Sequence, residues 1–148
     1  MEMRSEVVIG RPIADVFAGW AQIERFAEWW DPVVERRKLT DGPVAVGTQY
    51  AAVDRMPLGW RIESTLEITG FETNERIAGR LTGGASGVTW EARFEQPKGG
   101  TRFSLHTIAE PLGLKGILLR LMGGWFRRID GQALERFKAS QEAQRQTP

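Results

Sequence analysis

The sequence predicts an α+β fold in which a curved antiparallel β-sheet of about seven strands wraps around a long C-terminal helix. Two short helices are expected after the first strand. Apolar residues recur at helical spacing over residues 13–30, at every second position over residues 33–110, and again at helical spacing after Pro111. A sheet with one apolar face and a helix with one apolar stripe each need a partner, and a curved sheet lets each bury the other.

The N-terminal segment predicts a strand followed by the two short helices. Apolar and polar residues alternate over residues 3–9, as in a strand. Pro12 suits the first position of a helix, and apolar residues at helical spacing follow it to residue 20. The same spacing recurs over residues 23–30, so the second helix is expected to end before Pro32.

The central segment predicts an antiparallel meander. Its clearest alternating runs lie at residues 60–69, 88–95 and 102–106. In each run one face is apolar and the other polar, as expected for a sheet that meets solvent on one side only. Turn-forming residues separate the runs: Asp41-Gly42-Pro43, Thr73-Asn74-Glu75, Gly83-Gly84 and Lys98-Gly99-Gly100.

The C-terminal segment predicts one helix that crosses the whole sheet. Its apolar stripe consists of Leu114, Ile117, Leu118, Leu121, Met122, Trp125, Phe126, Ile129, Ala133 and Phe137. A helix of about 25–30 residues is roughly 40 Å long, and a strand of about 10 residues spans roughly 33 Å. Gly123 and Gly124 fall inside this helix, which predicts either a close approach to the sheet or a bend. Residues 1–148 are expected to form one domain whose polar tail frays from about residue 141.

Composition limits the classes of function. With 20 basic and 19 acidic residues the net charge is +1, so no overall field attracts nucleic acid and no nucleic-acid partner is expected. The chain has no cysteine, which excludes disulfides, catalytic thiolates, sulfur-ligated zinc and iron–sulfur clusters. The N-terminus lacks the apolar run of a signal peptide, and no stretch is long enough to span a membrane. We therefore expect a cytoplasmic protein without stable membrane insertion.

No catalytic or metal-binding motif stands out. His106 is the single histidine and falls on the polar face of its strand, so zinc sites with two or three histidines are excluded. We expect no metal and no cofactor. Residues 83–87 lack the spacing of a nucleophile elbow or of a P-loop and predict a flexible turn. Glu63 and Glu67 fall on a polar strand face, as solvated surface groups do.

Five local strings and the order of elements carry a family resemblance. The strings are Arg11-Pro12-Ile13-Ala14-Asp15-Val16-Phe17, Trp29-Trp30-Asp31-Pro32-Val33, Gly47-Thr48, Gly99-Gly100-Thr101-Arg102-Phe103 and Leu134-Glu135-Arg136-Phe137-Lys138. Over nearly the whole chain the sequence resembles the START/Bet v 1-like (SRPBCC) superfamily, in its polyketide cyclase/dehydrase branch. This resemblance implies a helix-grip fold with an internal cavity, because members bind lipids, sterols, polyketides or hormones and a minority catalyse cyclisation or dehydration.

The residues expected to line this cavity come from the inward face of the sheet and from the C-terminal stripe. They are Tyr50, Trp60, Ile62, Ser64, Leu66, Trp90, Ala92, Phe103, Leu105, Thr107, Leu118, Met122 and Trp125. Their hydroxyl and indole groups either find partners within a packed core or orient a ligand in an otherwise apolar pocket.

Three classes of function remain open. The first is binding of a small hydrophobic molecule of lipid, polyketide or aromatic type, by a monomer or a homodimer. The second is a cyclase or dehydratase that acts on a polyketide-like or aromatic substrate, for which the sequence names no catalytic residue. The third is protein interaction, because Trp29-Trp30 resembles the Trp-rich segment of Hsp90-activator-like relatives on the same fold. Trp30 is expected in the core and Trp29 at the cavity rim or surface.

Overall fold

One seven-stranded antiparallel sheet carries the fold, with helices packed on one of its faces. The computed structural model describes residues 1–56, 59–110, 117 and 121–145. The element order is β1 (Glu2–Ile9), α1 (Ile13–Trp20), the 3₁₀ helix η1 (Ile23–Glu28), β2 (Val33–Lys38), β3 (Gln49–Arg55), β4 (Arg61–Glu72), β5 (Arg76–Gly83), β6 (Val88–Glu95), β7 (Thr101–Ala109) and α3 (Gly123–Arg145).

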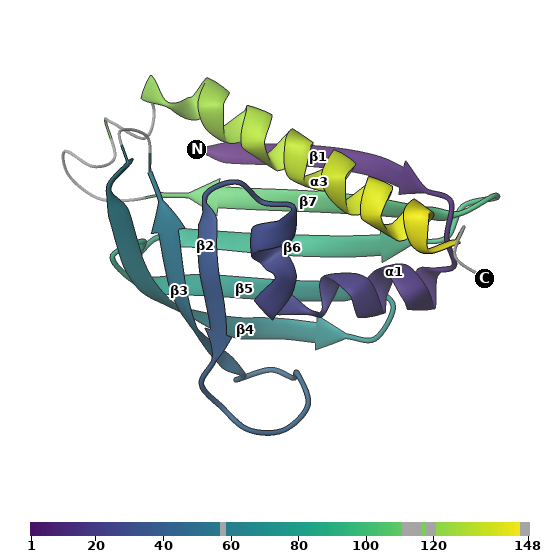
Figure 1. Cartoon of the computed structure of the whole chain (residues 1–148), viewed down its shortest axis with the longest axis horizontal. Coiled ribbons are helices and arrows are strands. Elements are labelled where there is room, and N and C mark those ends of the chain that lie inside the picture. The colour runs from purple at the N-terminus through teal and green to yellow at the C-terminus, as the bar shows by residue number, and fades with distance from the viewer. Residues whose placement is uncertain (57–58, 111–116, 118–120, 146–148) are drawn as a thin grey trace.

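Strand order in the sheet is β1-β7-β6-β5-β4-β3-β2, so the meander predicted from the alternation is confirmed and β1 joins its far edge. Figure 1 shows α1 and α3 on the same face of the sheet, with β2 and β3 turned away from the direction of the other strands. Register shifts interrupt β2 between Val33 and Glu35 and β4 between Ile68 and Gly70. Because such bulges bend a strand and increase its twist, they help the sheet to curve around α3.

The two short helices lie where the sequence predicts them, but they differ in type. Residues 13–20 form the α-helix α1, whereas η1 is a 3₁₀ helix that ends before Pro32. Residues three apart lie on one face in both helix types, so an apolar pattern over six residues does not distinguish them.

The C-terminal helix begins later than its apolar stripe predicts. Gly123 and Gly124 form the first turn of α3 rather than its interior. A Cβ at Gly124 would meet no described atom within 4 Å, so the expected close approach to the sheet does not occur there. Ile117 and Leu121 are 60% and 80% exposed, so the expectation that they cover the sheet is wrong. The prediction for Leu114 and Leu118 falls outside the described residues.

The other end of α3 is held more firmly than a fraying tail would be. The helix continues to Arg145, and Gln141 is 3% exposed. The backbone N–H of Gly10 donates to Glu142 Oε2 at 2.9 Å, and Arg11 Nη1 donates to the Gln141 carbonyl at 3.1 Å. The frayed tail expected from about residue 141 is therefore wrong for residues 141–145, because these contacts tie them to the β1–α1 connection.

An aromatic cluster packs around Trp20, the last residue of α1, within the hydrophobic core. Trp20 is fully buried at its centre. Six ring centroids lie 4.7–6.3 Å from its own: those of Phe26, Trp29, Trp30, Trp90, Phe103 and Phe137. Trp29 is only 2% exposed, so the prediction of a rim or surface position is wrong: its ring packs on Trp20 and Phe137.

Candidate functional site

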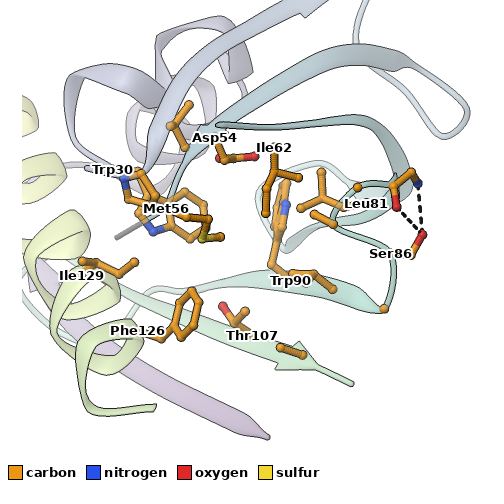
Figure 2. A pocket seen from close by; sticks show the side chains of 18 of the residues that line it. Trp30, Asp54, Met56, Ile62, Leu81, Ser86, Trp90, Thr107, Phe126 and Ile129 are labelled. Atoms are coloured by element: carbon orange, nitrogen blue, oxygen red, sulfur yellow. Dashed lines mark hydrogen bonds between the residues drawn. The ribbon is translucent and has the colours of Figure 1, made fainter. Parts of the chain in front are cut away.

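A cavity of about 710 Å³ lies between the sheet and α3 and adjoins the aromatic cluster, because Trp30 and Trp90 belong to both. Small-molecule sites commonly have volumes of about 300–1,000 Å³, so the space is large enough for an organic ligand. Apolar side chains form most of its lining: Met3, Trp30, Val33, Met56, Trp60, Ile62, Leu81, Val88, Trp90, Met122, Phe126 and Ile129. Figure 2 shows Trp30, Met56, Trp90 and Phe126 turned toward one common space.

The sequence-predicted cavity residues divide between this space and the filled core. Those that line the cavity are Trp60, Ile62, Trp90, Thr107 and Met122. Tyr50, Leu66, Ala92, Phe103 and Leu105 share the inward face of the sheet but are buried within the core cluster. Strand alternation identifies which face a side chain occupies, but not whether a helix or a void lies opposite it.

Ser64 and Trp125 do not line the cavity as predicted, and Trp60 does so only at its edge. Ser64 Oγ accepts a hydrogen bond from the backbone N–H of Ala85 at 2.9 Å, so it holds the β5–β6 turn. Trp60 is 47% exposed because it precedes β4, where the strand alternation does not apply, and it lies at the cavity edge. Trp125 packs on its neighbour Phe126 and is not part of the lining, and Leu118 lies outside the described residues.

Tyr50 has a hydroxyl that no described residue contacts by a hydrogen bond. Burial raises the pKa of Tyr50 to about 12, with a smaller contribution from the negative charge of Glu24. Because the side chain lies in the core and not on the cavity wall, its hydroxyl is not placed to orient a ligand there.

Asp130 is a cavity residue that the stripe pattern did not reveal. It is 4% exposed on α3. Its Oδ1 accepts a hydrogen bond from Trp30 Nε1 and its Oδ2 accepts one from Thr107 Oγ1, both at 3.0 Å. Burial raises the pKa of Asp130 to about 6, against the opposing effect of these two hydrogen bonds. The available signal was a carboxylate four residues after Phe126, on the apolar stripe itself.

The raised pKa of Asp130 predicts a pH-dependent stability. The folded state binds the proton more tightly than the unfolded chain, so stability from this group is present below about pH 4 and lost as pH rises through about 6. The full loss is about 3 kcal/mol, of which about 1–1.5 kcal/mol falls between about pH 5 and about pH 8, and Asp130→Asn is expected to remove it. Urea unfolding at about pH 5 and about pH 8 measures this, and a wild-type minus variant difference that is equal at the two pH values would contradict it.

A second polar position on the cavity wall is the ion pair of Arg36 and Asp54. Both residues are buried, and Arg36 Nη2 donates to Asp54 Oδ1 at 2.9 Å. Burial raises the pKa of Asp54, while the charge and hydrogen bond of Arg36 act in the opposite direction. Arg36 Nε and Asp54 Oδ2 have no hydrogen-bond partner within the part of the chain that the structure describes.

The sequence pattern signals Asp54 but conceals Arg36. Asp54 follows Tyr50 and Ala52 at every second position of β3, and all three are buried. Strict alternation from Val33 would place Arg36 on the opposite face, but the register shift between Val33 and Glu35 brings it inward.

Of the groups predicted at the surface or in a turn, Glu63 and residues 83–87 border the cavity, whereas His106 does not. His106 Nε2 lies 3.4 Å from Glu2 Oε2 on the outward face of the sheet. Residues 83–87 form the predicted turn, in which Ser86 Oγ donates to the Gly83 carbonyl and accepts from the Gly83 N–H, as the dashed lines in Figure 2 show. Among the described residues, no three or more metal-ligating side chains cluster, and no helix is both long and apolar enough to cross a membrane.

A family model described as "Polyketide cyclase / dehydrase and lipid transport" matches residues 1–142. No curated protein matches the chain in sequence. The fold is similar to that of the protein TTHA0849 from Thermus thermophilus, with a TM-score of 0.79 at 18% identity over 97% of this chain and 98% of that one.

Two further structures have the same fold at low sequence identity. The di-domain ARO/CYC StfQ from the steffimycin biosynthetic pathway aligns with a TM-score of 0.75 at 12% identity, over 99% of this chain and 52% of that one. Ara h 8.0201 aligns with a TM-score of 0.64 at 12% identity, over 97% of this chain and 98% of that one. These similarities establish the helix-grip architecture of a curved sheet closed by a long C-terminal helix.

Proposed function

The chain belongs to the polyketide cyclase/dehydrase and lipid transport family, and from this premise we propose that it binds a small hydrophobic ligand in the cavity between the sheet and α3. The observation that carries the proposal is the volume of about 710 Å³ lined mainly by apolar and aromatic side chains. A packed core has no such void, because protein interiors leave few spaces larger than a water molecule.

The balance of energies indicates that the polar positions set selectivity. Burying about ten CH₂ groups contributes roughly 8 kcal/mol, and association costs about 4–15 kcal/mol. Apolar contact alone therefore gives weak and unselective binding. Among the described wall residues, Asp130, Thr107 and the Arg36–Asp54 pair are the buried polar groups that can add to it.

A tryptophan in place of Ala109 is expected to block the cavity. Ala109 is 6% exposed on β7 and lines the cavity, so a larger side chain there enters the ligand's space. Affinity for the neutral fluorophore phenylnaphthylamine is expected to fall by about tenfold or more, and the rise in melting temperature on adding the fluorophore to shrink with it. Fluorescence titration and thermal unfolding measure the two effects.

Val8→Trp is the matched control, because Val8 is 46% exposed on β1 and does not line the cavity. Ala85→Trp, in the turn that borders the same space, provides a second blocking variant if Ala109→Trp lowers stability. The proposal fails if wild-type protein binds no phenylnaphthylamine, or if both blocking variants bind it as well as the control does.

A cyclase or dehydratase is the second candidate, and Asp130 is the observation that favours it. A general acid or base works best when its pKa lies near the working pH, and the pKa of this cavity-lining group is about 6. The test is turnover of a polyketide-like substrate that disappears in Asp130→Asn while binding persists. The protein-interaction hypothesis has lost its basis, since Trp29 and Trp30 are both buried.

A further inference from the structure

We infer that the ligand of this cavity carries a positively charged nitrogen, such as an ammonium group, and that Asp130 binds it. This inference rests on the proposed function, because it names the class of ligand for the same cavity. Three features of the structure lead to it: the balance of charge on the cavity wall, the unused acceptor capacity of Asp130, and the aromatic rings beside that carboxylate.

The charge balance inside the cavity is negative. Asp130 accepts hydrogen bonds from the indole N–H of Trp30 and the hydroxyl of Thr107, which are both neutral. It forms no ion pair with any described residue. Arg36 and Asp54 neutralise each other within their own ion pair at 2.9 Å. Among the buried side chains of the described wall, the carboxylate of Asp130 is therefore the uncompensated charge.

Several other charged groups, on the cavity edge, on α3 and on β1, are exposed. Arg61, Glu63 and Glu110 border the cavity but are exposed, as are Arg127 and Arg128 on α3 itself. On β1, the strand against which α3 packs, Glu2 and Arg4 are exposed. They form an ion pair in which Arg4 Nη2 lies 3.9 Å from Glu2 Oε2. Water screens such surface charges, so they compensate a buried carboxylate weakly.

Asp130 retains room for a further donor. An ionised carboxylate offers about four lone-pair sites, and the bonds from Trp30 and Thr107 occupy one on each oxygen. The two bonds hold the carboxylate in one orientation on the cavity wall. A ligand N–H can therefore reach an acceptor that needs no rearrangement.

Aromatic rings surround the place where the cation would lie. Trp30, which holds Asp130, lines the cavity together with Trp90 and Phe126, and Figure 2 shows the three rings around one space. The face of an aromatic ring attracts a cation, and this attraction is strongest where water is excluded. A cavity lined by a carboxylate and several rings is thus complementary to a hydrophobic amine.

Neutral and cationic ligands are expected to respond to pH in opposite directions. A neutral ligand displaces water from Asp130 and so favours its protonated form, which weakens binding by up to about tenfold per pH unit above about 6. A cationic ligand favours the ionised carboxylate, so its binding strengthens as pH rises through the same range.

The experiment compares naphthylmethylamine with naphthylmethanol, two probes of nearly equal shape of which the amine alone is a cation. Isothermal titration calorimetry at about pH 5 and about pH 8 measures both affinities. At the higher pH the amine is expected to bind about tenfold more tightly than the alcohol, and at the lower pH this advantage is expected to vanish. Asp130→Asn is expected to abolish both the amine's advantage and its pH dependence, whereas Glu63→Gln, at the exposed cavity edge, retains them.

Other outcomes overturn the inference and separate it from the proposed function. If the alcohol binds at least as tightly as the amine at about pH 8, or if the amine keeps its advantage in Asp130→Asn, the cation is not what Asp130 recognises. The proposed function then stands, because the alcohol still binds. If neither probe binds and phenylnaphthylamine does not either, the proposed function fails as well. The comparison of pH values within the wild-type protein needs no variant to fold.

Discussion

Trp20→Ala is expected to lower the free energy of unfolding by about 3–5 kcal/mol, since a large side chain is removed from a filled core. Trp20 is fully buried, and six aromatic ring centroids lie within 4.7–6.3 Å of its own. Its indole N–H has no hydrogen-bond partner among the described residues, so the loss comes from packing and not from a broken hydrogen bond. Urea unfolding followed by far-ultraviolet circular dichroism measures it, because tryptophan fluorescence itself changes with this substitution.

Trp60→Ala is the matched control for this prediction. It removes the same side chain from a position that is 47% exposed, and the expected loss is below about 1 kcal/mol. Equal losses for the two variants would show that the aromatic cluster does not hold the sheet and helices together. A large loss for Trp20→Ala alone locates the main stabilising contacts at the end of the sheet near α1.

Arg36→Met is expected to lower the free energy of unfolding by about 3–5 kcal/mol, because it leaves the buried carboxylate of Asp54 without its cation. Burial already raises the pKa of Asp54, and loss of Arg36 raises it further. Because the pKa of this carboxyl group is then higher in the folded than in the unfolded state, its protonation stabilises the folded protein. The loss is therefore smaller at about pH 5 than at about pH 8, which urea unfolding at both values tests.

The double variant Arg36→Met with Asp54→Leu separates the ion pair from the packing around it. Replacing both members by apolar residues of similar size removes the buried charge, so most of the stability is expected to return. A double variant as unstable as Arg36→Met alone would mean that shape, and not the unpaired charge, caused the loss. The double variant also shows whether this pair contributes to the binding of phenylnaphthylamine.

The sheet could be predicted because each of its strands meets solvent on one face and the core on the other. That condition imposes the alternation seen in residues 88–95, and β6 has these same bounds. The C-terminal helix was harder to delimit, because an apolar stripe continues through residues that the fold leaves exposed. Leu121 is 80% exposed although it occupies a stripe position. Helical spacing shows which residues share a face, and only the neighbouring elements decide where that face is covered.

Less of the candidate site than of the fold could be predicted from the sequence. Thr107 was expected to face inward, but its partner Asp130 comes from α3 and Trp30 from the segment before β2, so the cluster exists only in three dimensions. Arg36 owes its inward position to a bulge that leaves no mark in the hydrophobic pattern. The division of the inward face into core and cavity depends on where the aromatic cluster ends, which no local pattern encodes.

Trp30 and Trp90 belong to both the aromatic cluster and the cavity wall, which has a consequence for how such a protein can change. Side chains such as Met56 and Ile62 line the space for a guest molecule and lie outside the core cluster, whereas the scaffold is anchored around Trp20. Substitutions at Met56 or Ile62 can therefore change specificity without disturbing the core cluster, whereas substitutions at Trp30 or Trp90 alter both. An architecture divided in this way can acquire new guests during evolution, or in a directed-evolution experiment, without first acquiring compensating mutations.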